Sequence, residues 1–395
     1  MIKKIFIIMG ILVVCLTVFV FFFINHYKKL DQLKIRRTSE VNSIPFRHSS
    51  SGHILIDLNI DDSGKTYPFI LDTGASNYLF HNFPTKNIGK SIGKGISKDT
   101  NGKISFPRIY TIPFLKIGDT ELENIAFSIS TTKFNCTEEI YGIIGKNIMH
   151  HFVWQIDFQN KIIHIAKDIK YLSKTKEKEI KIKLKENKFS HHLYIPLHIE
   201  SNVKTKIILD TGLGGNISLS PKEINKLTST NKKRNILGEG SRGLGGKSDS
   251  KQYLLHFNSL FLGKNKELPI SDISVKVSEK SSFKALGIGV LKNFLVTIDW
   301  TNKMLTLVQK TKTMNLTEKG FGIRFGFEEG LYIRSIIEGS KADSIGLKPY
   351  MKGFLINGKS IETIEQFCSF NTIKDKLSNI EIKFIKSKKV YNLQK

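Results

Sequence analysis

The stretch FILDTGASNYLF (residues 69–80) places a carboxylate between an apolar run and a glycine turn, after which apolar residues resume. One Asp-Thr-Gly carries little information, because a strand that ends in a turn often contains such residues. A second stretch, IILDTGLGGNISLS (residues 207–220), repeats Ile-Leu-Asp-Thr-Gly and again continues into apolar residues. Two identical pentapeptides in the same surroundings indicate that the chain contains an internal repeat.

The repeat extends beyond the pentapeptides. YGIIGKNIMHHFVWQIDFQNKIIHI (residues 141–165) has a counterpart in ALGIGVLKNFLVTIDWTNKMLTLV (residues 285–308). Each segment contains an apolar-Gly step, an Ile-Asp pair, an Asn-Lys turn and a closing apolar strand. Asp157 and Asp299 come just before these turns, so we expect them to shape hairpins rather than to take part in catalysis.

The repeated region has the pattern of many short β-strands. HILIDLNI (residues 53–60) places an apolar side chain at every second position, which is the period of a half-buried strand. Gly, Asn, Asp and Ser interrupt the apolar runs. The sequence therefore predicts a mainly β protein.

These residues resemble the pepsin/retropepsin-like aspartic peptidases over about residues 48–310. The resemblance rests on both Asp-Thr-Gly motifs and on two apolar-Gly elements, Ile143-Ile144-Gly145 and Gly287-Ile288-Gly289. It implies a bilobal fold in which each lobe supplies one aspartate, so that Asp72 and Asp210 form a catalytic dyad. The short lobes and few cysteines look closer to the bacterial, membrane-tethered members of the family.

The resemblance also implies roles for the residues beside the dyad. Thr73 and Thr211 would form hydrogen bonds across the lobe interface and fix its geometry. Gly74 and Gly212 would permit the tight turn and leave backbone amides free to point at the carboxylates.

The chemistry of amide hydrolysis explains why the motif is needed twice. One group must take a proton from water while another protonates the carbonyl oxygen and then the leaving nitrogen. Two adjacent carboxyls share one proton because they cannot both ionise at low cost, and they therefore supply both functions. Their titrations are coupled, so the sequence does not assign the proton to either aspartate. The expected substrate is a peptide or protein, and no cofactor or metal is expected.

The residue after each Asp-Thr-Gly departs from the pepsin pattern. Pepsin-like members usually have Ser or Thr there, and its hydroxyl binds an aspartate. Ala75 and Leu213 occupy these positions. The missing donor implies that the lower pKa of the pair rises, which favours activity nearer neutral pH.

Two histidine pairs, His150-His151 and His191-His192, raise the question of a metal. Adjacent residues of a strand point to opposite faces, so neither pair chelates an ion readily. We assign them structural or surface roles.

A hairpin that covers the substrate is expected in the first lobe. KGISKDTNGKISFPRIY (residues 94–110) contains an Asn101-Gly102 turn, with Tyr110 as the nearby aromatic, and is the candidate flap. In the second lobe, LGEGSRGLGGKSDS (residues 237–250) is rich in glycine, which predicts a mobile loop. Both stretches also fit ordinary surface loops.

Residues 319–367 resemble a PDZ domain. The features are a carboxylate loop formed by Gly320, Phe321, Gly322 and Ile323, a strand at 331–333, a helix that opens at 339–343 and a turn at 356–358. The resemblance implies that the C-terminus of a peptide adds a strand to a sheet edge while loop amides hold its carboxylate. Tyr350-Met351 stands where such domains often have Gly-Asp. The alternative is a module that only packs against the lobes.

The N-terminus predicts a membrane anchor. Residues 5–24 are mainly apolar and are flanked by lysines, and no A-x-A-like cleavage site follows. About twenty helical residues span roughly 30 Å, the thickness of the hydrocarbon core. The basic residues after this segment outnumber those before it, which favours a cytoplasmic soluble part. Signal anchors near the start of a chain more often export the domains on their C-terminal side, and we therefore expect a single-pass protein with an extracytoplasmic soluble part.

The net charge bears on the expected binding partners, and the cysteine content bears on the redox compartment. The formal net charge is +26, but the lysines are scattered along the chain and form no stripe interleaved with aromatics, so nucleic acid is not an expected partner. Cys15, Cys136 and Cys368 are too few and too far apart in sequence to predict a disulfide framework, and they leave the redox compartment undecided.

Two classes of function fit these features. The first is a membrane-anchored aspartic endopeptidase whose PDZ domain binds substrate or partner C-termini. The second is a peptide-binding protein built on the same scaffold, with lapsed catalysis. The expected organisation is an anchor (1–29), a tether (30–45), a first lobe (46–170), a second lobe (171–312) and a PDZ domain (315–395).

Overall fold

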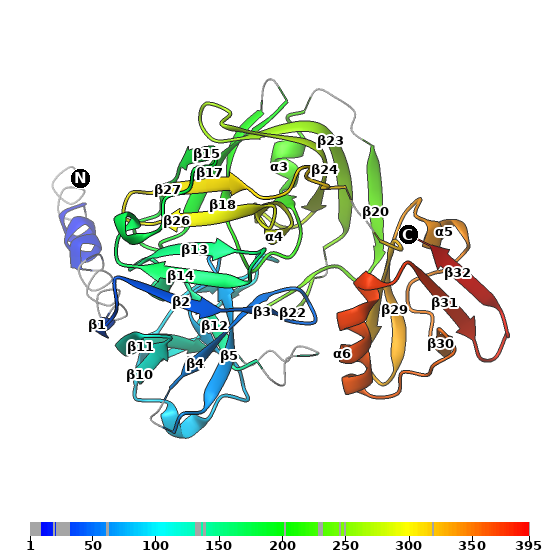
Figure 1. The fold of residues 1–395 in the computed structure, drawn as a ribbon, viewed down its shortest axis with the longest axis horizontal. Coiled ribbons are helices and arrows are strands. Elements are labelled where there is room, and N and C mark those ends of the chain that lie inside the picture. The colour runs from blue at the N-terminus through cyan, green and yellow to red at the C-terminus, as the bar shows by residue number, and fades with distance from the viewer. Residues whose placement is uncertain are drawn as a thin grey trace, which may run out of the picture.

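The computed structural model describes residues 9–18, 20, 32–60, 63–130, 136, 140–200, 203–227, 232–244, 246–248, 250–317 and 320–394. The prediction of a mainly β protein is confirmed. Two repeats, residues 41–166 and residues 179–309, pack side by side, and a C-terminal module of residues 320–394 lies beside them (Figure 1).

The first repeat is built on a nine-stranded sheet. Its strands, in spatial order, are β1 (Lys34–Arg37), β11 (Thr120–Ile129), β6 (Tyr78–Leu79), β12 (Gly142–Gly145), β5 (Thr66–Asp72), β4 (Ile54–Asn59), β10 (Arg108–Ile117) and β7 (Ser91–Lys94), with β3 (Arg47–His48) paired to β4. The one-turn helix α2 (Lys146–Met149) follows β12. The alternation read from residues 53–60 corresponds to β4, where Ile54, Ile56 and Leu58 are fully buried.

The second repeat repeats this arrangement within a ten-stranded sheet. Its order is β16 (Lys185–Glu186), β17 (Leu193–Ile199), β18 (Val203–Leu209), β25 (Ala285–Leu286), β19 (Ile217–Leu219), β24 (Leu268–Ser278), β23 (Gln252–Leu262), β20 (Lys233–Gly238), β29 (Leu331–Ile337) and β28 (Ile323–Phe327). Its short helices are α3 (Pro221–Ile224) and α4 (Ile288–Leu291). The last two strands belong to the C-terminal module, so the pairing of β20 with β29 joins that module to the second repeat.

A six-stranded sheet connects the repeats. Its order is β15 (Glu179–Lys183), β27 (Met304–Gln309), β26 (Phe294–Asp299), β13 (Val153–Asp157), β14 (Ile162–Ala166) and β2 (Val41–Pro45), so each repeat contributes three strands. The central pair β13–β26 is antiparallel, with Gln155 opposite Thr297 at its middle. Asp157 and Asp299 each accept a backbone N–H three residues on, from Asn160 and Asn302, as expected for turn residues. One continuous apolar core runs under both repeats.

The C-terminal module has its own core, formed by β28, β29 and a three-stranded sheet of β30 (Phe354–Ile356), β31 (Asn379–Phe384) and β32 (Val390–Gln394). It contains the helices α5 (Lys341–Ser344) and α6 (Ile364–Ile373). Thr363 and Gln366 form a capping box that begins α6, and the helix buries Phe367 and Phe370 against β28.

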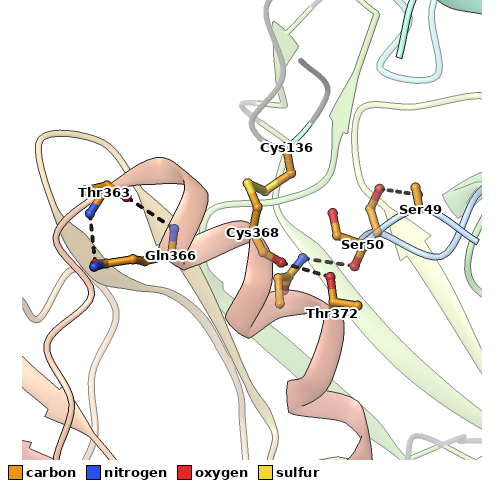
Figure 2. The surroundings of a disulfide bond; sticks show 9 residues. Ser49, Ser50, Cys136, Thr363, Gln366, Cys368 and Thr372 are labelled. Carbon is orange, nitrogen blue, oxygen red and sulfur yellow. Dashed lines mark hydrogen bonds between the residues drawn. A yellow bond between two sulfur atoms is a disulfide. The ribbon is translucent and has the colours of Figure 1, made fainter. Parts of the chain in front are cut away.

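One prediction about the N-terminal part of the chain was wrong. The segment 30–45 is not a polar tether, because β1 pairs with β11 and β2 pairs with β14. Cys136 and Cys368 form a disulfide, a single pair that the sequence did not predict (Figure 2). It joins the segment after β11 to α6, and Asn371 of α6 also donates to the carbonyl of Ser50 at 3.2 Å.

The predicted anchor lies mostly outside the described residues. Residues 9–18 and 20 are helical, with exposed apolar side chains. Within the part of the chain that the structure describes, no helix has the length and apolar content needed to span a bilayer.

Candidate active site

The two Asp-Thr-Gly motifs occupy equivalent positions in the repeats. Asp72 ends β5, which pairs in parallel with β12 so that Asp72 lies beside Gly145. Asp210 follows β18, which pairs in parallel with β25, and its amide donates to the carbonyl of Leu286 at 3.0 Å. The counterpart of Gly145 is therefore Gly287, and the predicted element Gly287-Ile288-Gly289 was placed two residues too late.

The strand residue that lies beside each aspartate must be glycine, because a side chain there would collide with the backbone of the motif loop. A Cβ on Gly145 would lie 2.3 Å from the carbonyl oxygen of Ala75, and one on Gly287 would lie 2.2 Å from that of Gly215. Both distances are far below van der Waals contact with backbone, which cannot move aside cheaply. The two glycines thus allow each aspartate loop to sit against its neighbouring strand.

Backbone amides hold each carboxylate in the same way. Asp72 Oδ1 accepts from the N–H groups of Gly74 at 2.8 Å and Ala75 at 3.1 Å. Asp210 Oδ1 accepts from Gly212 at 2.8 Å and from the next amide at 2.9 Å. These bonds fix the position of Oδ1 in each carboxylate.

The two threonines bind the loops to each other. Thr73 Oγ1 donates to the carbonyl of Leu209 at 2.7 Å, and Thr211 Oγ1 donates to the carbonyl of Leu71 at 2.9 Å. Each threonine hydroxyl also accepts the other threonine's N–H at 3.0 Å. Both threonines are buried, so four hydrogen bonds cross the interface out of contact with water.

The carboxylates meet across this interface. A Cβ on Gly74 would lie 2.6 Å from Cγ of Asp210, and one on Gly212 would lie 2.1 Å from Oδ2 of Asp72. Burial, followed by the charge and the hydrogen bond of Asp72, raises the pKa of Asp210 well above its ordinary value. The pair therefore retains a proton at a pH where an isolated aspartate is ionised.

Two histidines with no predicted role in the site flank the pair. His192 Nε2 lies 2.9 Å from the carbonyl oxygen of Gly74, and His53 is hydrogen-bonded to the backbone of Gly212. Each histidine belongs to one repeat and contacts the motif of the other. Burial lowers the pKa of both, to about 4 for His192, so both imidazoles are neutral at neutral pH.

Lys146 is a further buried group near the aspartates. It begins α2, and its Nζ donates to Ser76 Oγ at 3.2 Å. Burial lowers its pKa to about 8, while the charges of Asp72 and Asp210 act in the opposite direction. The charged ammonium of Lys146 favours the ionised form of one carboxyl. It also lowers the pKa of His192, as the second-largest cause of that shift after burial.

Two hairpins cover the cavity above the aspartates. The first is β8 (Ser97–Lys98) with β9 (Ile104–Ser105), which includes the predicted Asn101-Gly102 turn, and the second is β21 (Arg242–Gly243) with β22 (Gly246–Lys247). Their tips meet, because Asn101 Nδ2 donates to the carbonyl of Gly246 at 3.4 Å. Both hairpins line one cavity of about 1640 Å³ that contains the aspartates.

Tyr110, the predicted flap aromatic, lies on β10. Among the described residues that line the cavity are its neighbours Pro107 and Ile109, but not Tyr110 itself. Tyr78 of β6 lines the cavity instead, and its hydroxyl donates to Ser97 Oγ at 2.6 Å, at the base of the first hairpin.

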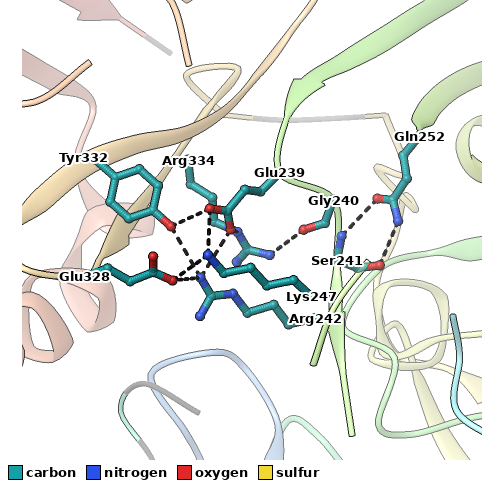
Figure 3. Close-up of polar contacts among 9 residues, drawn as sticks. All are labelled: Glu239, Gly240, Ser241, Arg242, Lys247, Gln252, Glu328, Tyr332 and Arg334. Atoms are coloured by element: carbon teal, nitrogen blue, oxygen red, sulfur yellow. Dashed lines mark hydrogen bonds and ion pairs between the residues drawn. The ribbon is translucent and has the colours of Figure 1, made fainter. Parts of the chain in front are cut away.

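The second hairpin is fixed to the C-terminal module by ionic contacts (Figure 3). Arg242 and Lys247 both reach Glu328, at 2.8 and 2.7 Å. Tyr332 donates to Glu239 at 2.8 Å, and burial together with this carboxylate raises the pKa of Tyr332 to about 12. Side chains of a hairpin that lines the cavity thus contact residues of the C-terminal module.

The predicted carboxylate loop lies at the start of β28. Gly320 and Gly322 have φ of 150° and 69°, conformations that favour glycine, while Phe321 is buried in the module core and Ile323 begins the strand. These four residues do not contribute to the described lining of the cavity.

The histidine pairs do not gather metal ligands. His150 stacks on His191 with ring centroids 4.0 Å apart, and within the described residues no three His, Cys, Asp or Glu side chains form a group able to hold an ion. Comparison of the sequence with models of known protein families finds no match, and comparison with curated proteins finds none either.

Proposed function

We propose that the protein is an aspartic endopeptidase with a pepsin/retropepsin-like bilobal fold and a C-terminal PDZ domain. The observation that carries this proposal is the approach of Asp72 and Asp210 across the interface, where each carboxylate lies against the glycine of the other motif and accepts two backbone amides of its own. The threonine bonds across the interface hold the two loops in register. No step of the proposed reaction requires a cofactor.

In the proposed reaction the ionised member of the pair takes a proton from water as the water oxygen attacks the peptide carbonyl carbon. The protonated member gives its proton to the carbonyl oxygen. When the tetrahedral intermediate collapses, the C–N bond breaks and the leaving nitrogen receives a proton from the pair. The two hairpins exclude bulk water from the cavity during these steps.

We also propose that the soluble part lies outside the cytoplasm, attached by an N-terminal membrane helix. The Cys136–Cys368 disulfide supports this placement, because such bonds persist in oxidising compartments. A peptide that binds the PDZ domain by its C-terminus, from a substrate or a partner, is part of the proposal.

The test compares hydrolysis of a diverse peptide pool by the full chain in detergent with that by Asp72→Asn and Asp210→Asn. Each substitution should reduce turnover roughly 10²- to 10⁴-fold, because it removes one partner in proton transfer. Asp57→Asn is the matched control, since Asp57 is an exposed carboxylate of β4 that pairs with Arg47 at 2.8 Å. Equal hydrolysis by all four proteins would refute the enzyme and favour a peptide-binding protein with lapsed catalysis.

A further inference from the structure

Lys146 is a buried cation that the proposed reaction does not use. Eight lysines are among the described residues that line the cavity, and Lys146 is the only one of these eight that is buried. Within the described part of the chain, its Nζ contacts one acceptor, Ser76 Oγ at 3.2 Å, and forms no ion pair with a carboxylate. Because an ammonium group has three N–H donors, Lys146 can still donate to a ligand in the cavity.

The aspartates do not compensate for the burial of this ammonium. Their charges raise the pKa of Lys146, but burial is the larger cause and lowers that pKa to about 8. His192 is neutral at neutral pH and supplies no negative charge. A buried cation without a paired anion is costly, and a carboxylate that contacts it forms a charge-assisted hydrogen bond. Lys146 should therefore bind a carboxylate that enters the cavity.

The second repeat has an apolar residue at the equivalent position. The amide of Lys146 donates to the carbonyl of Ala75 at 3.0 Å, and the amide of Ile288 donates to the carbonyl of Leu213 at 2.8 Å. Ala75 and Leu213 each follow an Asp-Thr-Gly, so Lys146 and Ile288 are counterparts. Ile288 is buried, and both Ile288 and Leu213 line the cavity. At this position the lining is thus cationic in the first repeat and apolar in the second.

This difference bears on the residues that flank the bond to be broken. In the proposed reaction that bond lies at Asp72 and Asp210, where the two repeats meet, so a bound peptide extends along both repeats. The residue on one side of the bond then meets a buried cation, and the residue on the other side meets an apolar surface.

We propose that the enzyme selects peptide bonds that have an acidic residue on one side, held by Lys146, and an apolar residue on the other, packed against Ile288. This inference rests on the proposed peptidase function. Lys146 is then a specificity-determining residue, while proton transfer stays with the two aspartates.

The first experiment exposes a diverse peptide library to the full chain in detergent and reads the cut sites by mass spectrometry. The cut bonds should be enriched in Asp or Glu on one side and in Ile, Leu, Val or Phe on the other. Two matched peptides, with Glu or Gln at the preferred acidic position, then measure the effect of the charge alone. The glutamate peptide should have a kcat/KM about 10- to 100-fold higher, the range expected for hydrogen bonds to a charged group.

The second experiment removes the cation. Lys146→Met keeps a long side chain without the charge, and Lys146→Gln keeps a donor for Ser76 Oγ. Both variants should lower the ratio of the two rates to about 1 by slowing the glutamate peptide, while they still cut the glutamine peptide. Lys292→Gln is the matched control, because Lys292 lines the same cavity from the second repeat but is exposed. It should leave the ratio within about twofold of the parent value, since an exposed charge contributes little.

Hydrolysis without any preference for acidic residues would overturn the inference and leave the peptidase intact. The inference would also be wrong if both Lys146 variants kept the preference. The same holds if Lys292→Gln reduced it equally, because general attraction by the basic cavity would then explain it. Hydrolysis that matches Asp72→Asn for every peptide would instead refute the peptidase itself.

Discussion

The neutral imidazole of His192 should make the protein less stable in acid. Its pKa falls from 6.5 to about 4 on folding, chiefly through burial. Because the folded pKa lies below the unfolded one, the unfolded chain binds the proton more tightly. The stabilisation is complete above pH 6.5 and is lost as the pH falls towards 4. A difference of this size corresponds to about 3 kcal/mol.

His192→Gln isolates this contribution. The glutamine amide can still donate to the carbonyl of Gly74 but does not titrate, so the variant should lose about 3 kcal/mol less stability than the parent between pH 7 and pH 4. In thermal unfolding of a chain of this length, this difference corresponds to roughly 4–5 °C. His164→Gln, at a partly exposed position of β14, is the control. Parallel stability curves for the parent and His192→Gln across this pH range would refute the reasoning.

Three further groups of substitutions test the fold. Thr211→Val removes two buried bonds across the repeats and should cost about 2–4 kcal/mol in urea unfolding, whereas Thr211→Ser should cost less than half of that. Cys136→Ser, like Cys368→Ser, opens a loop with a sequence separation of 232. It should lower stability by up to about 5 kcal/mol; an unchanged urea midpoint would contradict this. Gly142→Ala would place a Cβ 2.1 Å from a backbone oxygen, whereas Gly215→Ala meets nothing within 4 Å. Gly142→Ala should lower the free energy of unfolding by roughly 3 kcal/mol, and Gly215→Ala should lower it by less than about 0.5 kcal/mol. Both values are measured from the shift of the urea midpoint.

The sequence predicted the repeat and the positions of the two motifs because both are local. Identical pentapeptides after apolar runs are visible without knowledge of the fold, and so is the Asn101-Gly102 turn. Which strand lies beside each aspartate is a question of pairing register. The pattern alone did not distinguish Gly287 from Gly289, since both follow an apolar residue.

The contacts between distant segments could not be read in this way. His53 and His192 each stand one residue before an equivalent strand, a signal that an alignment of the two repeats would have revealed, but their contact with the opposite motif depends on how the repeats pack. β1 has charged and exposed side chains and therefore resembles a linker in composition. Cys136 and Cys368 are distant in sequence and adjacent in space, and spacing carries no information about such a pair.

The symmetric register of β13 and β26 bears on the origin of the chain. Val153 lies opposite Asp299 and Asp157 opposite Leu295, so a second copy of β13 could take the place of β26 with the same offset. An ancestral half-length protein could have assembled as a homodimer through this edge. After fusion of two copies, the sequence of each half could change independently. The hairpin of one half could then form contacts with the C-terminal module without the same change in the hairpin of the other half.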